Sequence, residues 1–120
     1  MTGRPFTILH ADELEKSGDW LLARRSLGLS AFGMNLVDIP PGGQIPEHDE
    51  TDRDQEEVFV LLSGEATIVI DGDEHDLPEG AFARLAPELT RTVVNRGSGS
   101  VRLLIASAPR TSGYEPMDWA

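Results

Sequence analysis

Residues 56–72 read EEVFVLLSGEATIVIDG, and this stretch decides the fold. It contains two apolar runs, Glu57–Leu62 and Glu65–Ile70, which are rich in the β-branched and aromatic side chains that strands favour. Ser63-Gly64 separates the runs, and Asp71-Gly72 follows the second one. An Asp-Gly pair is typical of a type I′ hairpin turn, because both central positions of that turn need a positive φ. The stretch therefore predicts strands and a tight turn rather than a helix.

Short strand-like segments separated by turn residues continue on both sides of this stretch. The segments that we predict to contain strands are Phe6–Leu9, Trp20–Leu29, Ser30–Ile39, Ala81–Leu85, Arg91–Asn95 and Val101–Ala106. Only Asp12–Lys16 reads as helical, over about one turn. Residues 112–120 read as a tail, and its Tyr114 and Trp119 suggest that it packs against something. Many short strands at close spacing predict an all-β sandwich or barrel.

Size and charge limit the classes of protein that fit. A chain of 120 residues predicts a single domain over residues 1–120. The net charge of −11 argues against binding to nucleic acid or to an anionic membrane, because both partners are themselves negative. The absence of cysteine excludes thiolate metal sites, thiol nucleophiles and disulfides. With no signal-peptide run and no segment of bilayer length, we expect a cytoplasmic protein.

One histidine lies in an acidic segment just before the strand-forming stretch. If residues 46–50 are extended, His48 and Glu50 point the same way, since side chains on a strand repeat every two residues. A short loop then brings Glu57 back beside them. One imidazole and two carboxylates that face one another are suitable ligands for a divalent cation. His10 and His75 lie in no comparable pattern, and we assign them no role.

The spacing around these residues resembles the first motif of the cupin superfamily. Gly42 is followed by five residues and then His48, and Glu57 is followed by six residues and then Gly64. Glu50 stands where the family has a second histidine. The chain looks like a small single-domain bacterial cupin, which implies a jelly-roll β-barrel (a double-stranded β-helix). The expected barrel core covers about residues 30–108, with short N-terminal strands before it and the tail after it.

The second cupin motif is matched less completely. Pro87 fits its start and Asn95 fits its end, but Arg91 stands four residues before Asn95, where the family has a histidine. The resemblance implies a metal ion in the barrel mouth, held by three histidines and a glutamate, and often a homodimer. Two of these four ligand positions are changed here. A carboxylate at Glu50 still suits iron, manganese, zinc or nickel, whereas a guanidinium cannot ligate a cation.

Two interpretations of Arg91 follow. In the first, Arg91 lies inside the barrel, holds Glu50 and Glu57 together in place of a metal, and leaves the protein without a metal cofactor. In the second, Arg91 swings outward toward an anionic substrate, and His48, Glu50 and Glu57 bind one divalent metal ion. The sequence favours the first interpretation, because Arg91 replaces a ligand of the usual metal set.

These alternatives lead to three hypotheses for function. The first is a cupin that binds a small molecule in the barrel mouth, with Arg91, Phe59 and Leu61 as ligand contacts and a degenerate metal site. The second is a metal-dependent enzyme, of the oxygenase or isomerase/epimerase type, acting on a small polar substrate through His48, Glu50 and Glu57. The third is a structural or sensory module that dimerises through its outer strands. The partners that we expect are thus a small-molecule ligand and a second copy of the chain.

Overall fold

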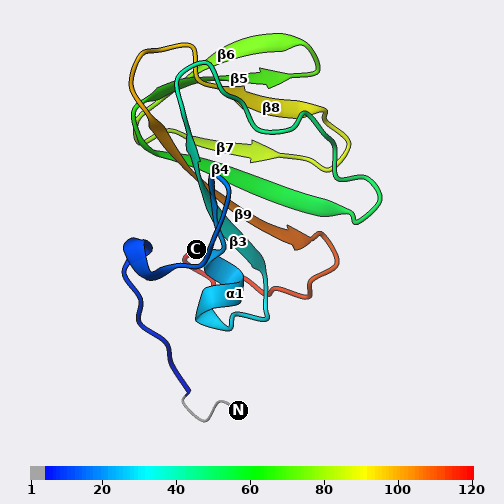
Figure 1. The fold of residues 1–120 in the computed structure, drawn as a ribbon. Helices are drawn as coiled ribbons and strands as arrows, with labels where there is room; N and C mark the ends of the chain where they lie inside the picture. The colour runs from blue at the N-terminus through cyan, green and yellow to red at the C-terminus, as the bar shows by residue number, and fades with distance from the viewer. Residues whose placement is uncertain (1–4) are drawn as a thin grey trace.

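The computed structural model describes residues 5–120, which form two antiparallel β-sheets (Figure 1). The larger sheet has six strands in the order β1-β2-β3-β9-β4-β7, and the smaller has three in the order β6-β5-β8. The elements are a 3-10 helix (Ala11–Glu13), β1 (Lys16–Ser17), β2 (Trp20–Leu21), α1 (Ala23–Leu27), β3 (Gly33–Ile39), β4 (Gln55–Ser63), β5 (Glu65–Ile70), β6 (Asp73–Pro78), β7 (Phe82–Leu85), β8 (Arg91–Val94) and β9 (Val101–Pro109). This architecture confirms the predicted all-β jelly-roll barrel.

The main core lies between the two sheets, and β4 shows how the sequence builds it. Gln55, Glu57, Phe59 and Leu61 are buried, while the residues between them are half-buried, as strand periodicity requires. The buried apolar side chains of this core are Val37, Ile39, Ile45, Phe59, Leu61, Ile68, Leu77, Leu85, Val93, Val101 and Leu103. They come from both sheets, so the core fixes one sheet against the other.

A second, smaller cluster covers part of the outer face of the larger sheet. Leu36 of β3 belongs to this cluster, whereas its neighbour Val37 belongs to the main core, so the two side chains point to opposite faces. Leu14 and Ala23 of the N-terminal segment pack against Leu36, together with Leu21 of β2. The N-terminal segment therefore shields the β2–β3 half of this outer face.

The predicted hairpin forms at Asp71-Gly72. These residues have φ values of 50° and 86°, the left-handed region that a type I′ turn needs. Ile70 pairs with Asp73 directly across the turn, and β6 continues the pairing as far as Pro78. We did not predict β6 as a strand, because four of its six residues are exposed charged groups or histidine and give no apolar alternation.

One of the predicted N-terminal strands is wrong, because Phe6–Leu9 belongs to neither sheet. The segment Trp20–Leu29 contains a strand as predicted, but this strand covers only Trp20–Leu21. The rest of that segment contains helix α1, which ends at Gly28 in the left-handed conformation. Sequence periodicity cannot reveal a five-residue helix, because five residues make little more than one turn. The helical turn predicted at Asp12–Lys16 is the 3-10 helix near Ala11–Glu13.

The C-terminal tail does not pack as predicted within this chain. Tyr114 and Trp119 both have exposed side chains, as does Met117 between them. The contact that these side chains suggested is therefore absent from the described residues of one copy of the chain.

Among residues 5–120, no helix is long and apolar enough to cross a bilayer. The cytoplasmic location expected from the sequence and the extent of the single domain stay predictions.

Gly64, between β4 and β5, permits a close approach of two chain segments. Its φ is +88°, and a Cβ there would lie 2.8 Å from the carbonyl oxygen of Ser100. We expect Gly64→Ala to lower the free energy of unfolding by about 2 kcal/mol, because the contact is with backbone and cannot relax by side-chain rotation. Urea denaturation measures this loss. Gly80→Ala is the matched control, since Gly80 has a φ of +85° but no atom within 4 Å of an added Cβ. Equal losses for the two variants would contradict the steric account.

Candidate metal and ligand site at the barrel mouth

Glu57 projects from β4 into the barrel. It is the third residue of the strand and shares its buried face with Phe59 and Leu61. The Glu57 side chain is 8% exposed, while Phe59 and Leu61 are fully buried in the main core. The predicted shared face is therefore confirmed. Phe59 and Leu61 lie deeper in the barrel than Glu57, among the other apolar side chains of the core. A contact of either residue with a ligand stays a prediction.

The segment between β3 and β4 brings His48 and Glu50 to the same place. His48 and Arg91 of β8 form an isolated antiparallel bridge, with N–H···O distances of 3.1 and 2.9 Å in the two directions. The N–H of Glu50 donates to the carbonyl of Pro87 at 2.8 Å. These backbone bonds hold the segment in extended form along β8, as the sequence predicted, so that His48 and Glu50 lie beside Glu57.

The three predicted metal ligands form one group. His48 Nε2 lies 3.2 Å from Glu50 Oε2 and 3.8 Å from Glu57 Oε1. One ligand atom from each residue falls within 4.8 Å of the others. Accessibility decreases inward, from a 35% exposed His48 side chain to a 17% exposed Glu50 and an 8% exposed Glu57. The group thus opens to solvent at His48.

The His48 ring is oriented by a backbone contact. Its Nδ1 lies 2.8 Å from the carbonyl oxygen of Pro46, and a carbonyl can only accept, so Nδ1 carries a proton. This bond points Nε2 toward Glu50 and Glu57, which also present acceptor oxygens. Nε2 is therefore the ring nitrogen that can meet a cation or share a proton with the carboxylates. The same backbone contact is the usual way of orienting a metal-ligating histidine.

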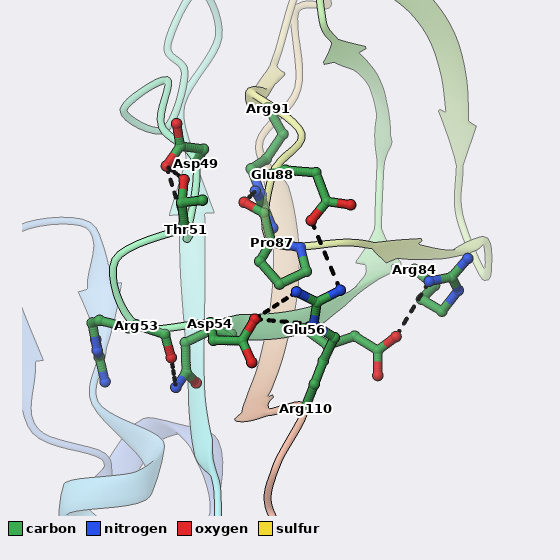
Figure 2. Close-up of polar contacts among 11 residues, drawn as sticks. Asp49, Thr51, Arg53, Asp54, Glu56, Arg84, Pro87, Glu88, Arg91 and Arg110 are labelled. Carbon is green, nitrogen blue, oxygen red and sulfur yellow. Dashed lines mark hydrogen bonds and ion pairs between the residues drawn. The ribbon is translucent and has the colours of Figure 1, made fainter.

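Arg91 lies inside the barrel, so the outward orientation considered from the sequence is wrong. Its side chain is fully buried, and its Nε is 3.3 Å from Glu57 Oε1. Its Nη1 donates to the carbonyl of Leu89. It also donates to the carbonyl of Pro87 at 3.4 Å (Figure 2). Charge pairing with Glu57 and these carbonyls compensate for burying the guanidinium. We did not predict the carbonyl contacts, since nothing in a sequence marks a backbone acceptor.

The charge pair at the base of the site is incompletely hydrogen-bonded. Glu57 Oε1 and Arg91 Nε and Nη2 are buried without a hydrogen-bond partner, because the ion pair is not aligned as a hydrogen bond. Burial raises the pKa of Glu57, while the charge of Arg91 acts in the opposite direction and Glu50 adds to the rise. The arrangement therefore favours either a protonated Glu57 or additional positive charge beside it.

The side chains of this site are of the types that bind a divalent cation, but a positive charge beside them opposes binding. An imidazole nitrogen and two carboxylates are suitable ligands, and their mutual distances allow them to surround one ion. Arg91, however, places a permanent positive charge against Glu57, the most buried of the three. The site can therefore hold a metal only against the repulsion of Arg91.

The fold and the site together define a class of protein, namely a jelly-roll barrel with a group of histidine and glutamate side chains at its mouth. A family model described as "Cupin domain" matches residues 35–107, which include His48, Glu50, Glu57 and Arg91. The chain belongs to the cupin family. The matched range omits the N-terminal segment and the tail.

Solved structures show the same fold. A cupin protein from Bacteroides fragilis is 21% identical, with a TM-score of 0.79 over 97% of this chain and 93% of that chain. A sugar phosphate isomerase from a cupin superfamily, from Silicibacter pomeroyi, is 24% identical, with a TM-score of 0.72 over 93% and 83%. A predicted oxalate decarboxylase from Thermotoga maritima is 14% identical, with a TM-score of 0.72 over 86% and 99%. At these identities the similarity shows the fold alone. No curated protein matches the chain.

Proposed function

We propose that this protein binds a small polar molecule at the barrel mouth, in a site where Arg91 supplies the positive charge that the cupin resemblance assigns to a metal ion. The observation that supports this most is the position of Arg91, fully buried and 3.3 Å from Glu57 Oε1. A divalent ion bound by Glu57 would lie beside this guanidinium, which stays protonated in proteins. The cost of that repulsion lowers the affinity for any metal.

The exposed groups of the site indicate the chemistry of the ligand. Glu50 and His48 form the accessible part, and the Glu50 carboxylate can only accept hydrogen bonds. Arg91 is buried deeper than these two residues, where it pairs with Glu57 and donates to two backbone carbonyls. A ligand of this site therefore carries hydroxyl or amino groups, which donate to Glu50 and exchange hydrogen bonds with His48.

NMR titration of the His48 ring tests this proposal. The panel of probes contains sugars, sugar phosphates, hydroxy acids and small amines. We expect at least one class to shift the His48 signals, and we expect Glu50→Gln to bind it at least about tenfold more weakly. Glu56→Gln is the matched control, because Glu56 neighbours Glu57 on β4 but points to the outer face. The proposal would be contradicted if no probe shifted the His48 signals, or if Glu50→Gln and the wild type bound the probe with equal affinity.

A metal-dependent enzyme of the oxygenase or isomerase/epimerase type is the second candidate. The orientation of His48 Nε2 toward Glu50 and Glu57 supports it. His48, Glu50 and Glu57 would hold the metal, which would act as a Lewis acid on an oxygen of the substrate. Similar folds carry the descriptions sugar phosphate isomerase and predicted oxalate decarboxylase, which make a small oxygen-rich substrate a reasonable first choice for assays.

A further inference from the structure

We propose that Arg110 is a positioning residue of the barrel mouth, which holds together the two loops that border the site. We call these the mouth loops. The first is residues 49–54, which carry Glu50 and lead into β4, and the second is residues 86–90, which connect β7 to β8 and lead into Arg91. The proposal rests on the proposed function, because Arg110 would affect a ligand only through these loops.

Arg110 holds the first mouth loop at Asp54 through three hydrogen bonds. The Nε and Nη2 groups of its guanidinium donate to Oδ1 of Asp54 at 3.0 and 2.7 Å. Its backbone N–H donates to the carbonyl oxygen of Asp54 at 3.1 Å. The last residue pair between β4 and β9 is Gln55 with Pro109. The bonds of Arg110 therefore continue this pairing one residue beyond the strands and into the loop.

The same guanidinium also reaches the second mouth loop. Its Nη1 lies 4.0 Å from Oε2 of Glu88, and Figure 2 shows the guanidinium between the carboxylates of Asp54 and Glu88. A planar guanidinium presents separate N–H groups in fixed directions, so it can meet two carboxylates at once. One side chain therefore links the two mouth loops.

The mouth loops meet at Glu50, the accessible carboxylate of the site. The N–H of Glu50 donates to the carbonyl oxygen of Pro87 at 2.8 Å, and the carbonyl of Glu50 accepts from the N–H of Gln55 at 3.3 Å. The carbonyl of Pro87 also accepts from Nη1 of Arg91 at 3.4 Å. A change in the separation of the loops would thus move both Glu50 and a backbone acceptor of Arg91.

The backbone of Asp54 shows why the first mouth loop needs to be held. Asp54 has a φ of 51°, in the left-handed region. A residue other than glycine is strained there, and it keeps this conformation only where its surroundings impose it. Arg110 bonds to both the carbonyl and the side chain of Asp54. Loss of these bonds would allow Asp54 to relax, and the loop that carries Glu50 would move with it.

Amide hydrogen exchange, measured by NMR without any ligand, tests this positioning role. We expect Arg110→Ala to exchange the N–H of Glu50 on the order of tenfold faster than the wild type, because its bond to Pro87 opens more often. The N–H of Gly42 serves as the internal reference. It donates to the carbonyl of Asn95 at 2.8 Å, at the far end of the same segment, and its exchange should not change.

Arg84→Ala is the matched control. Arg84 pairs with Glu56 at 3.2 Å, and these side chains are 69% and 44% exposed, compared with 53% and 42% for Arg110 and Asp54. The Arg84–Glu56 pair joins β7 to β4 and contacts neither mouth loop. Ion pairs this exposed contribute little to overall stability, so both variants should unfold at nearly the wild-type urea concentration. Only Arg110→Ala should change the exchange of Glu50.

Ligand binding tests the consequence for the site. The probe is the sugar, sugar phosphate, hydroxy acid or amine that shifts the His48 signals of the wild type. Arg110→Ala should bind this probe about tenfold more weakly, and Arg84→Ala should bind it as the wild type does. Arg110→Lys should recover only part of the affinity, because lysine keeps the charge but not the planar array of N–H groups.

The proposal would be overturned if Arg110→Ala and Arg84→Ala exchanged the Glu50 N–H at the same rate. It would also be overturned if the two variants bound the probe with equal affinity. The exchange measurement needs no ligand, so it decides on the positioning role even if no probe shifts the His48 signals. That last result would contradict the proposed function and leave the exchange result for Arg110 as it stands.

Discussion

Replacing Arg91 with methionine is expected to lower the free energy of unfolding at neutral pH by about 3 kcal/mol. Methionine keeps much of the unbranched apolar stem of arginine but removes the positive charge. The carboxylate of Glu57, 8% exposed, then loses the buried charge at 3.3 Å that offsets its desolvation. The carbonyls of Pro87 and Leu89 also lose the Nη1 donor. Urea denaturation of the wild type and the variant at one pH measures the difference.

The destabilisation by Arg91→Met should depend on pH in a defined direction. Burial raises the pKa of Glu57 in the folded protein even with Arg91 present, and removal of Arg91 raises it further. A carboxyl whose folded pKa lies above its unfolded value binds protons more tightly when folded, so folding loses stability as pH rises between the two values. We therefore expect the smallest loss at acid pH and the largest at neutral pH. Glu57→Gln combined with Arg91→Met should remove this pH dependence, and a loss that grows toward acid pH would contradict the assignment to Glu57.

Replacing Asn95 with alanine is expected to cost about 3 kcal/mol of unfolding free energy. Asn95 is fully buried, and its Nδ2 donates to the carbonyls of Ile39 and Gly99 at 2.9 and 2.7 Å. Its Oδ1 accepts from the N–H of Gly97 at 3.0 Å. Alanine leaves these three backbone groups without their partner, and unsatisfied polar groups are costly when buried. Thermal or urea denaturation measures the loss.

Asn35→Ala on β3 provides the control for this variant, because Asn35 is only half-buried. Its replacement should change the unfolding free energy by less than about 1 kcal/mol. Similar losses for the two asparagines would show that the three hydrogen bonds of Asn95 are not what stabilises this region. The comparison matters for the site, since the backbone of Asn95 also bonds to Gly42 and Gly43 at the start of the segment that carries His48.

Local sequence signals predicted most of the barrel. The Asp71-Gly72 turn and the apolar runs of β4 and β5 were recognised, because each depends on neighbouring residues. Strand β6 and helix α1 were missed for a different reason. The polar side chains of β6 face solvent, and five residues of α1 cannot show a helical period. Their structure follows from pairing and packing with distant segments.

The site was predicted in part for similar reasons. Motif spacing and strand periodicity correctly placed His48, Glu50 and Glu57 together. The direction of Arg91 could not be read from strand alternation, because β8 buries Arg91, Thr92 and Val93 in succession. Thr92 is satisfied by donating to the carbonyl of Ile45 at 2.6 Å, a contact between residues 47 positions apart. Only the assembled barrel shows that both faces of β8 are covered at this point.

In the proposed function, Arg91 takes the place of a cation beside Glu57. The most direct test measures the affinity of the wild type and of Arg91→His for manganese, iron(II), zinc and nickel by calorimetric titration. Arg91→His removes a fixed charge and adds a fourth ligand, an imidazole, which suits these metals. Glu57→Gln in the same background identifies the site at which a metal binds.

We predict that Arg91→His binds at least one of these metals on the order of 100-fold more tightly than the wild type. We also predict that Glu57→Gln abolishes the gain. A wild-type protein that already binds about one metal ion per chain with high affinity, and loses it in Glu57→Gln, would contradict the claim. In that case His48, Glu50 and Glu57 form a functional metal centre despite Arg91, and the metal-dependent enzyme becomes the first hypothesis.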